Sequence, residues 1–133
     1  MIKEILEENI MPVVDDKLLD FEKLCLEIIA SQNKEWKIEF DKLISKIKVI
    51  DRVYGNPFGI YVDFAKENWI ANMKLPNILS ADFELTERND AIVFMFYPNT
   101  DDKTPFIFLE VSICTGPLDI DYISRKISLE LGR

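Results

Sequence analysis

Apolar residues in the first fifty positions recur at the spacing of α-helices. The first series lies at steps of three and four residues, on one helix face, and consists of Val14, Leu18, Phe21, Cys25 and Ile28. The second series, within residues 34–52, has the same spacing and consists of Trp36, Phe40, Leu43, Ile47 and Ile50. A shorter amphipathic segment over residues 2–10 precedes both and is separated from them by Pro12. The pattern therefore predicts two or three N-terminal helices.

The pattern changes after a turn signal at Gly55, Asn56 and Pro57. Short apolar segments separated by polar turns follow, as is typical of antiparallel strands. We expect strands over residues 60–64, 83–86, 91–97 and 105–113. Residues 65–75 fit a helix face as well as a strand, and their alternation favours a strand.

A last apolar series at helical spacing closes the chain, and it consists of Ile120, Ile123, Ile127 and Leu131. Asp119 suits the start of this helix, and Gly132 suits its end. The chain has 133 residues without a repeat or linker, which is the size of one domain. The sequence therefore predicts a single α+β domain over residues 1–133, in which N-terminal helices pack on an antiparallel β-meander of four to five strands closed by a C-terminal helix.

The two longest expected strands each present two faces, because side chains alternate along a strand. One face is expected to form the core, with Ile92, Phe94, Phe96, Ile107, Leu109 and Val111. Phe83 and Leu85 join this face if the turn over residues 87–90 has two or four residues. A slip of one residue in the pairing register would exchange the two faces.

The opposite face is half apolar and rich in aromatic residues, whereas a solvated face is mostly polar. It carries Val93, Met95, Tyr97, Phe106 and Phe108, beside Glu84, Glu110 and Ser112. Two interpretations follow. Either the N-terminal or the C-terminal helix covers this face, or it is an aromatic patch ringed by carboxylates, as in protein-binding surfaces.

Charge and composition exclude several classes of function. Asp and Glu number 24 against 16 Lys and Arg, a net charge of −8, which disfavours binding to nucleic acid or to anionic membranes. The chain has no histidine, which excludes Ser-His and Cys-His catalysis and zinc sites that contain histidine. Cys25 and Cys114 lie far apart in the sequence, each among apolar neighbours, which favours two buried free thiols in a reducing cytosol. A single disulfide between them is the alternative. With no signal peptide pattern and no apolar run long enough to span a bilayer, we expect a cytoplasmic protein.

No spacing of carboxylates and no phosphate-binding loop indicates a catalytic centre. Glu110, Val111 and Ser112 stand where metal-dependent nucleases carry Glu-x-Lys, but the lysine is missing. We therefore expect no catalytic residues, metal or cofactor. The remaining chemical candidate is the aromatic bend over residues 54–69, where Tyr61, Asp63 and Glu67 could serve a small-molecule site or a carboxylate enzyme without histidine. A bend that packs its own aromatic residues into the core explains the same cluster.

An acidic surface with exposed aromatic residues favours a non-enzymatic protein-binding module with a basic protein partner. In size, charge and lack of histidine the chain resembles bacterial immunity proteins, which implies binding and neutralising a basic toxin, for example a nuclease. In charge and size it also resembles type III secretion chaperones, which have one helix before their first strands, whereas two or three are predicted here. We expect the chain, as a monomer or homodimer, to contact the toxin or effector through Glu84, Tyr97, Asp101, Asp102, Phe106, Phe108 and Glu110.

Overall fold

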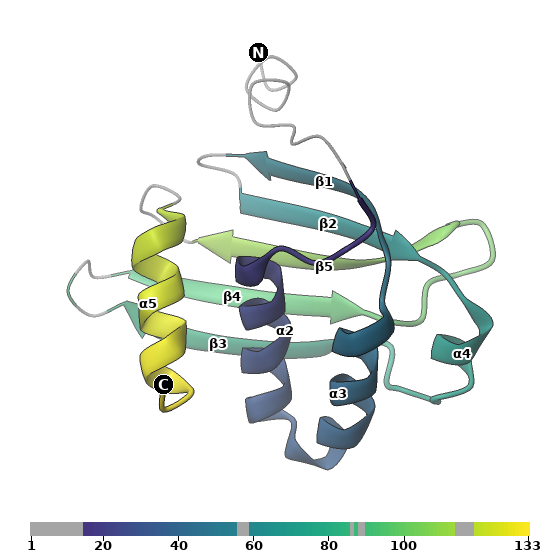
Figure 1. Cartoon of the computed structure of the whole chain (residues 1–133), viewed down its shortest axis with the longest axis horizontal. Helices are drawn as coiled ribbons and strands as arrows, with labels where there is room; N and C mark the ends of the chain where they lie inside the picture. The colour runs from purple at the N-terminus through teal and green to yellow at the C-terminus, as the bar shows by residue number, and fades with distance from the viewer. Residues whose placement is uncertain (1–14, 56–58, 86, 88–89, 114–118) are drawn as a thin grey trace.

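A computed structural model describes residues 15–55, 59–85, 87, 90–113 and 119–133 of the chain (Figure 1). In chain order its elements are α2 (Asp20–Gln32), the 3-10 turn η1 (Lys34–Trp36), α3 (Lys37–Lys46), β1 (Val49–Gly55), β2 (Gly59–Ala65), α4 (Asn68–Ala71), β3 (Leu79–Leu85), β4 (Asp90–Tyr97), β5 (Phe106–Ile113) and α5 (Ile120–Glu130). The five strands form one sheet, and α2, α3 and α5 lie side by side over one of its faces (Figure 1). The α+β class is therefore confirmed.

All strand pairs are antiparallel, in the order β1-β2-β5-β4-β3. Strands β3, β4 and β5 form the predicted meander, and the β1–β2 hairpin adds to it through β5, so β2 lies beside β5 and not beside β3. The C-terminal helix α5 closes the domain, with Ile123 and Ile127 fully buried.

The predicted core face is confirmed. Phe94 pairs with Val111 and Phe96 with Leu109, and all four side chains are buried. The pairing of β3 with β4 ends at Leu85 opposite Asp90. This register places Phe83 and Leu85 on the core side, as expected for such a turn. The helices cover this face with apolar side chains of their own, among them Cys25, Leu26, Ile29, Phe40 and Leu43.

Three segments differ from the sequence-based expectation. The first predicted helix begins only at Asp20, so Leu18, an expected member of its apolar face, precedes it. The helix expected across residues 34–52 ends at Lys46, and its last residues belong to β1. Ile47 and Ile50 continue the helical spacing by coincidence, while the β-branched residues of β1 pair with β2. The strand favoured for residues 65–75 is wrong, because the segment contains the short helix α4, which buries Ile70 and packs Trp69 against the core.

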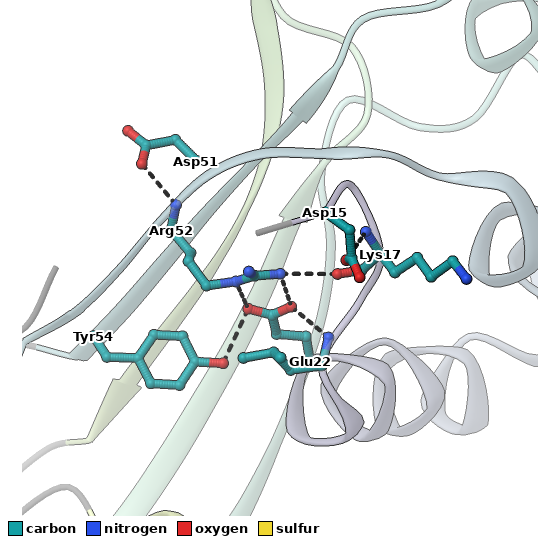
Figure 2. A network of polar contacts seen from close by, with 7 residues as sticks. Asp15, Lys17, Glu22, Asp51, Arg52 and Tyr54 are labelled. Carbon is teal, nitrogen blue, oxygen red and sulfur yellow. Dashed lines mark hydrogen bonds and ion pairs between the residues drawn. The ribbon is translucent and has the colours of Figure 1, made fainter. Parts of the chain in front are cut away.

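A buried ion pair joins α2 to β1 (Figure 2). The Arg52 guanidinium donates to both carboxylate oxygens of Glu22, from Nε at 2.8 Å and from Nη2 at 2.9 Å. Glu22 also accepts from the Tyr54 hydroxyl at 3.0 Å and from the backbone N–H of Leu19 at 2.8 Å, and Arg52 donates to the carbonyl of Lys17 at 3.0 Å. The Glu22 side chain is 0% exposed and that of Arg52 is 4% exposed, so each charge is compensated inside the protein. The sequence pattern did not identify this network.

The Cys25 thiol is free and buried one helical turn after Glu22. Burial raises its pKa well above the ordinary value, and the nearby carboxylate of Glu22 raises it further. The thiol is therefore held in its unreactive protonated form. Cys114 lies outside the described residues.

Candidate functional site on the open sheet face

The side of the sheet opposite to α2, α3 and α5, here called the open face, is covered by no helix in the described part of the chain (Figure 1). The expectation that the C-terminal helix could cover it is wrong, because α5 packs on the core side. The amphipathic segment over residues 2–10, the other candidate cover, lies outside the described residues. Side chains of the open face are partly exposed, for example Tyr61 at 39%.

Strand pairing aligns the open-face residues in rows that cross the sheet. From β1 to β4, one row consists of Asp51, Asp63, Phe108 and Tyr97. The next row, from β1 to β3, consists of Val53, Tyr61, Glu110, Met95 and Ser80. Residues that are opposite each other on neighbouring strands have Cβ atoms about 4.5–5.5 Å apart, so each row is a chain of side-chain neighbours.

Three rings form an aromatic cluster on this face, namely Tyr97, Phe106 and Phe108. Tyr97 and Phe108 are stacked, with centroids 4.3 Å apart and planes inclined by 20°. Phe106 meets Phe108 edge to face, with centroids 6.1 Å apart. Such pairs contribute about 0.5–1.5 kcal/mol beyond area burial, so the rings hold one another in place before any partner arrives.

Carboxylates lie next to the aromatic cluster. Glu110 accepts a hydrogen bond of 3.4 Å from the Tyr97 hydroxyl and is opposite Tyr61 on β2. Partial burial and the charge of Glu110 raise the pKa of both tyrosines. Partial burial also raises the pKa of Asp63, and its like-charged neighbour Asp51 raises it further. The only basic residue in the five strands is Arg52, whose side chain lies on the core side, so the strands bring no cation to the open face.

The structure places four of the seven predicted contact residues together, since Tyr97, Phe106, Phe108 and Glu110 are neighbours on the open face. Glu84 shares the face but stands on edge strand β3, opposite Ala91. Strand spacing and rise place it roughly 17 Å from Glu110. The seven residues therefore do not form one compact site.

Asp101 and Asp102 lie in the loop between β4 and β5, where Asp101 supports the loop. Its Oδ1 atom accepts from the backbone N–H groups of Lys103 and Thr104 and from the Thr104 hydroxyl, at 2.9–3.0 Å. These hydrogen bonds from Thr104 lower its pKa. Lys66 holds the same loop by donating to the carbonyls of Thr100, Asp101 and Thr104. Asp102 is exposed.

Among the described residues, the aromatic side chains of the bend lie on both sides of the sheet, so the alternative interpretation of one pocket there does not fit, and core packing explains Tyr54 and Phe64. Tyr54 and Phe64 lie on the core side and are buried, whereas Tyr61 lies on the open face. Phe58 lies outside the described residues. Tyr61 and Asp63 belong instead to the open-face rows, as the alternation within residues 60–64 could have indicated once β2 was placed beside β5.

A separate hollow of about 410 Å³ lies between α2, α3 and the C-terminal residues. Four of the charged groups that line it form two ion pairs, Glu27 with Arg133 and Asp41 with Lys37, and Lys34 lines it as well. In the described part of the chain, no three His, Cys, Asp or Glu side chains are arranged to hold a metal ion. No helix there has the length and apolar character needed to cross a membrane.

No family model, no curated protein and no solved structure matches this chain. Function is therefore inferred from the chemistry of the open face.

Proposed function

We propose that this chain is a non-enzymatic protein-binding module that binds and inhibits a basic protein through its open face. The observation that supports this proposal is the partly exposed aromatic cluster beside Glu110 and Asp63, on a face to which the strands contribute no cation. Aromatic residues are enriched at the centres of protein interfaces, and surrounding carboxylates steer a basic partner toward them.

The size and rigidity of the open face suit a folded partner. The four spacings of about 4.8 Å between five strands, and about seven residues of about 3.4 Å rise along each strand, give a projected area of roughly 460 Å². A typical interface buries about 800 Å² on each side, so the face would supply more than half of one. Because the rings are already stacked, little side-chain entropy remains to be lost on binding.

Charge distinguishes between possible occupants of the face. Five of the carboxylate residues in the strands stand at open-face positions, namely Asp51, Asp63, Asp82, Glu84 and Glu110. A second copy of the chain would place a like set against them, which disfavours a face-to-face homodimer, whereas a basic partner neutralises them. An immunity-type inhibitor of a basic toxin fits this chemistry. A secretion-type chaperone would use the same face for a basic effector, so the identity of the partner separates the two.

The experiment compares a face variant with a charge-matched control. Phe108→Ala with Glu110→Lys alters the open face. Ile38→Ala with Glu35→Lys makes the same change of charge, and also truncates an apolar side chain, on the exposed helix layer. Each immobilised protein is incubated with a lysate of the cell in which the protein naturally occurs, and the captured proteins are identified by mass spectrometry. The captured partner is then purified and its activity is titrated with each variant.

We expect wild type and control to capture the same basic protein and to inhibit its activity, and the face variant to do neither. Capture and inhibition by the face variant at wild-type strength would refute the proposal. Unchanged far-UV circular dichroism of both variants shows that the fold is retained.

A further inference from the structure

We infer that the open face recognises an arginine side chain of its partner, with Glu110 as the paired carboxylate and the rings of Tyr61 and Tyr97 as the surfaces on which the guanidinium lies. This inference rests on the proposed function, since it names the chemical group by which that partner is held.

Glu110 has a tyrosine neighbour on each adjacent strand: Tyr61 directly across on β2, and Tyr97 diagonally across on β4, where Met95 is the residue directly opposite. The Tyr97 ring is stacked on Phe108 with one of its faces. The Tyr97 hydroxyl donates to Glu110 at 3.4 Å. Glu110 is itself partly exposed and has no Lys or Arg partner among the described residues. A carboxylate flanked by two aromatic rings offers an ion pair and a cation–π contact to one incoming cation.

The shape of the site favours arginine over lysine. Among the described residues, the open face is the surface of a sheet, and no helix there rises beside it to enclose a compact ammonium group. A guanidinium is planar and weakly hydrated, so it can stack on a ring while its N–H groups pair with a carboxylate. A lysine ammonium keeps more of its hydration and gains less from an open aromatic surface.

Asp63 adds a second negative group close by. It is a diagonal neighbour of Glu110 across the β2–β5 pair, at about 7–8 Å. Asp63 is also opposite Asp51, so two like charges already face each other at this end of the row. A cation bound at Glu110 reduces the repulsion between Asp63 and Asp51. The cation is therefore stabilised by the charge of Asp63 as well as by that of Glu110.

Blocked tripeptides test this assignment directly. Acetyl-Gly-Arg-Gly-amide and acetyl-Gly-Lys-Gly-amide are titrated into the ¹⁵N-labelled full chain, and backbone amide shifts are followed by NMR. We expect the arginine peptide to shift the amides of Tyr61, Tyr97 and Glu110 and to bind about two- to fivefold more tightly than the lysine peptide. Glu110→Gln should abolish this preference, while Glu35→Gln on the helix layer should leave it unchanged.

A conservative pair of variants isolates the contribution of the ring. Tyr61→Phe keeps the ring and should keep the arginine preference, whereas Tyr61→Leu should lose it. Equal shifts from both peptides, shifts that map elsewhere, or unchanged binding by Glu110→Gln would overturn the arginine assignment.

The two proposals fail in different ways. If the peptides show no preference while the face variant still loses the captured partner, the arginine assignment is wrong and the proposed function stands. If the face variant keeps the partner, the proposed function is wrong whatever the peptides show.

Discussion

Removing the Arg52 guanidinium should be among the most destabilising single changes to this protein. Arg52→Met preserves an unbranched side chain but deletes two hydrogen bonds to Glu22 and one to the carbonyl of Lys17. Glu22, with its side chain 0% exposed, then keeps only the Tyr54 hydroxyl and the Leu19 N–H as partners. An uncompensated buried charge of this kind costs about 3–5 kcal/mol. A domain of this size has a total stability of about 5–15 kcal/mol, so the variant loses a large fraction of it.

The free energy of unfolding is measured by urea denaturation followed by far-UV circular dichroism. The informative control removes the whole network with Glu22→Leu, Arg52→Met and Tyr54→Phe, because no buried charge then remains. We expect this triple variant to be more stable than Arg52→Met alone by at least about 1 kcal/mol, although it carries more substitutions. Arg52→Met within about 1 kcal/mol of wild type would show that water or rearrangement compensates Glu22, and the reasoning would fail.

Three further changes test other parts of the structure. Gly59→Ala should lower the stability by about 1–3 kcal/mol, because φ is +113° there and an added Cβ would lie 2.2 Å from the Val111 carbonyl oxygen; a melting temperature equal to wild type would contradict this. Lys66→Met should remove the donor to three loop carbonyls and increase amide hydrogen exchange in residues 98–105, while Lys42→Met on the exposed side of α3 should leave that exchange unchanged. Asp63→Asn should stabilise the protein at pH 7 by about 0.5 kcal/mol, because it removes the repulsion by Asp51, and should weaken partner binding. The pKa of Asp63 is higher in the folded than in the unfolded state, so the stability of the fold decreases as the pH rises from the unfolded to the folded pKa of this residue. Below the ordinary aspartate pKa, Asp63 is neutral in both states, and the gain from Asp63→Asn should vanish. Denaturation curves that show an equal gain at that low pH would contradict repulsion by Asp51 as its cause.

The two faces of β4 and β5 could be predicted because a strand alternates with a period of two. Phe94 and Phe96 on one side, and Met95 and Tyr97 on the other, follow from that period and from a hairpin whose loop aligns them. The same period within residues 60–64 separates Tyr61 and Asp63 from the core. The pattern does not predict which strand lies beside β2, because its partner β5 is more than forty residues away in the sequence.

Long-range contact also explains why the buried ion pair was not predicted. Glu22 falls next to Phe21 in a helix with an apolar stripe, and Arg52 falls in a segment whose spacing continues that of α3. Their pairing depends on the first turn of α2 lying within reach of the Arg52 side chain, thirty residues later in the chain. Periodicity describes one element at a time, so it identifies faces but not the partner of a charged side chain on them.

One edge of the sheet, strand β3, is closed by side chains from the end of α2. Gln32, at the end of α2, donates to the carbonyl of Asp82 at 2.8 Å and accepts from its N–H at 3.1 Å, and Asn33 donates to the carbonyl of Ser80 at 2.8 Å. These side chains occupy backbone groups of β3 that an added strand would need, so this edge resists extension by another chain. The core face is filled by the helices (Figure 1). Folding therefore accounts for the core face and for this edge, and the aromatic cluster with the carboxylates around it is the surface that we propose binds the partner.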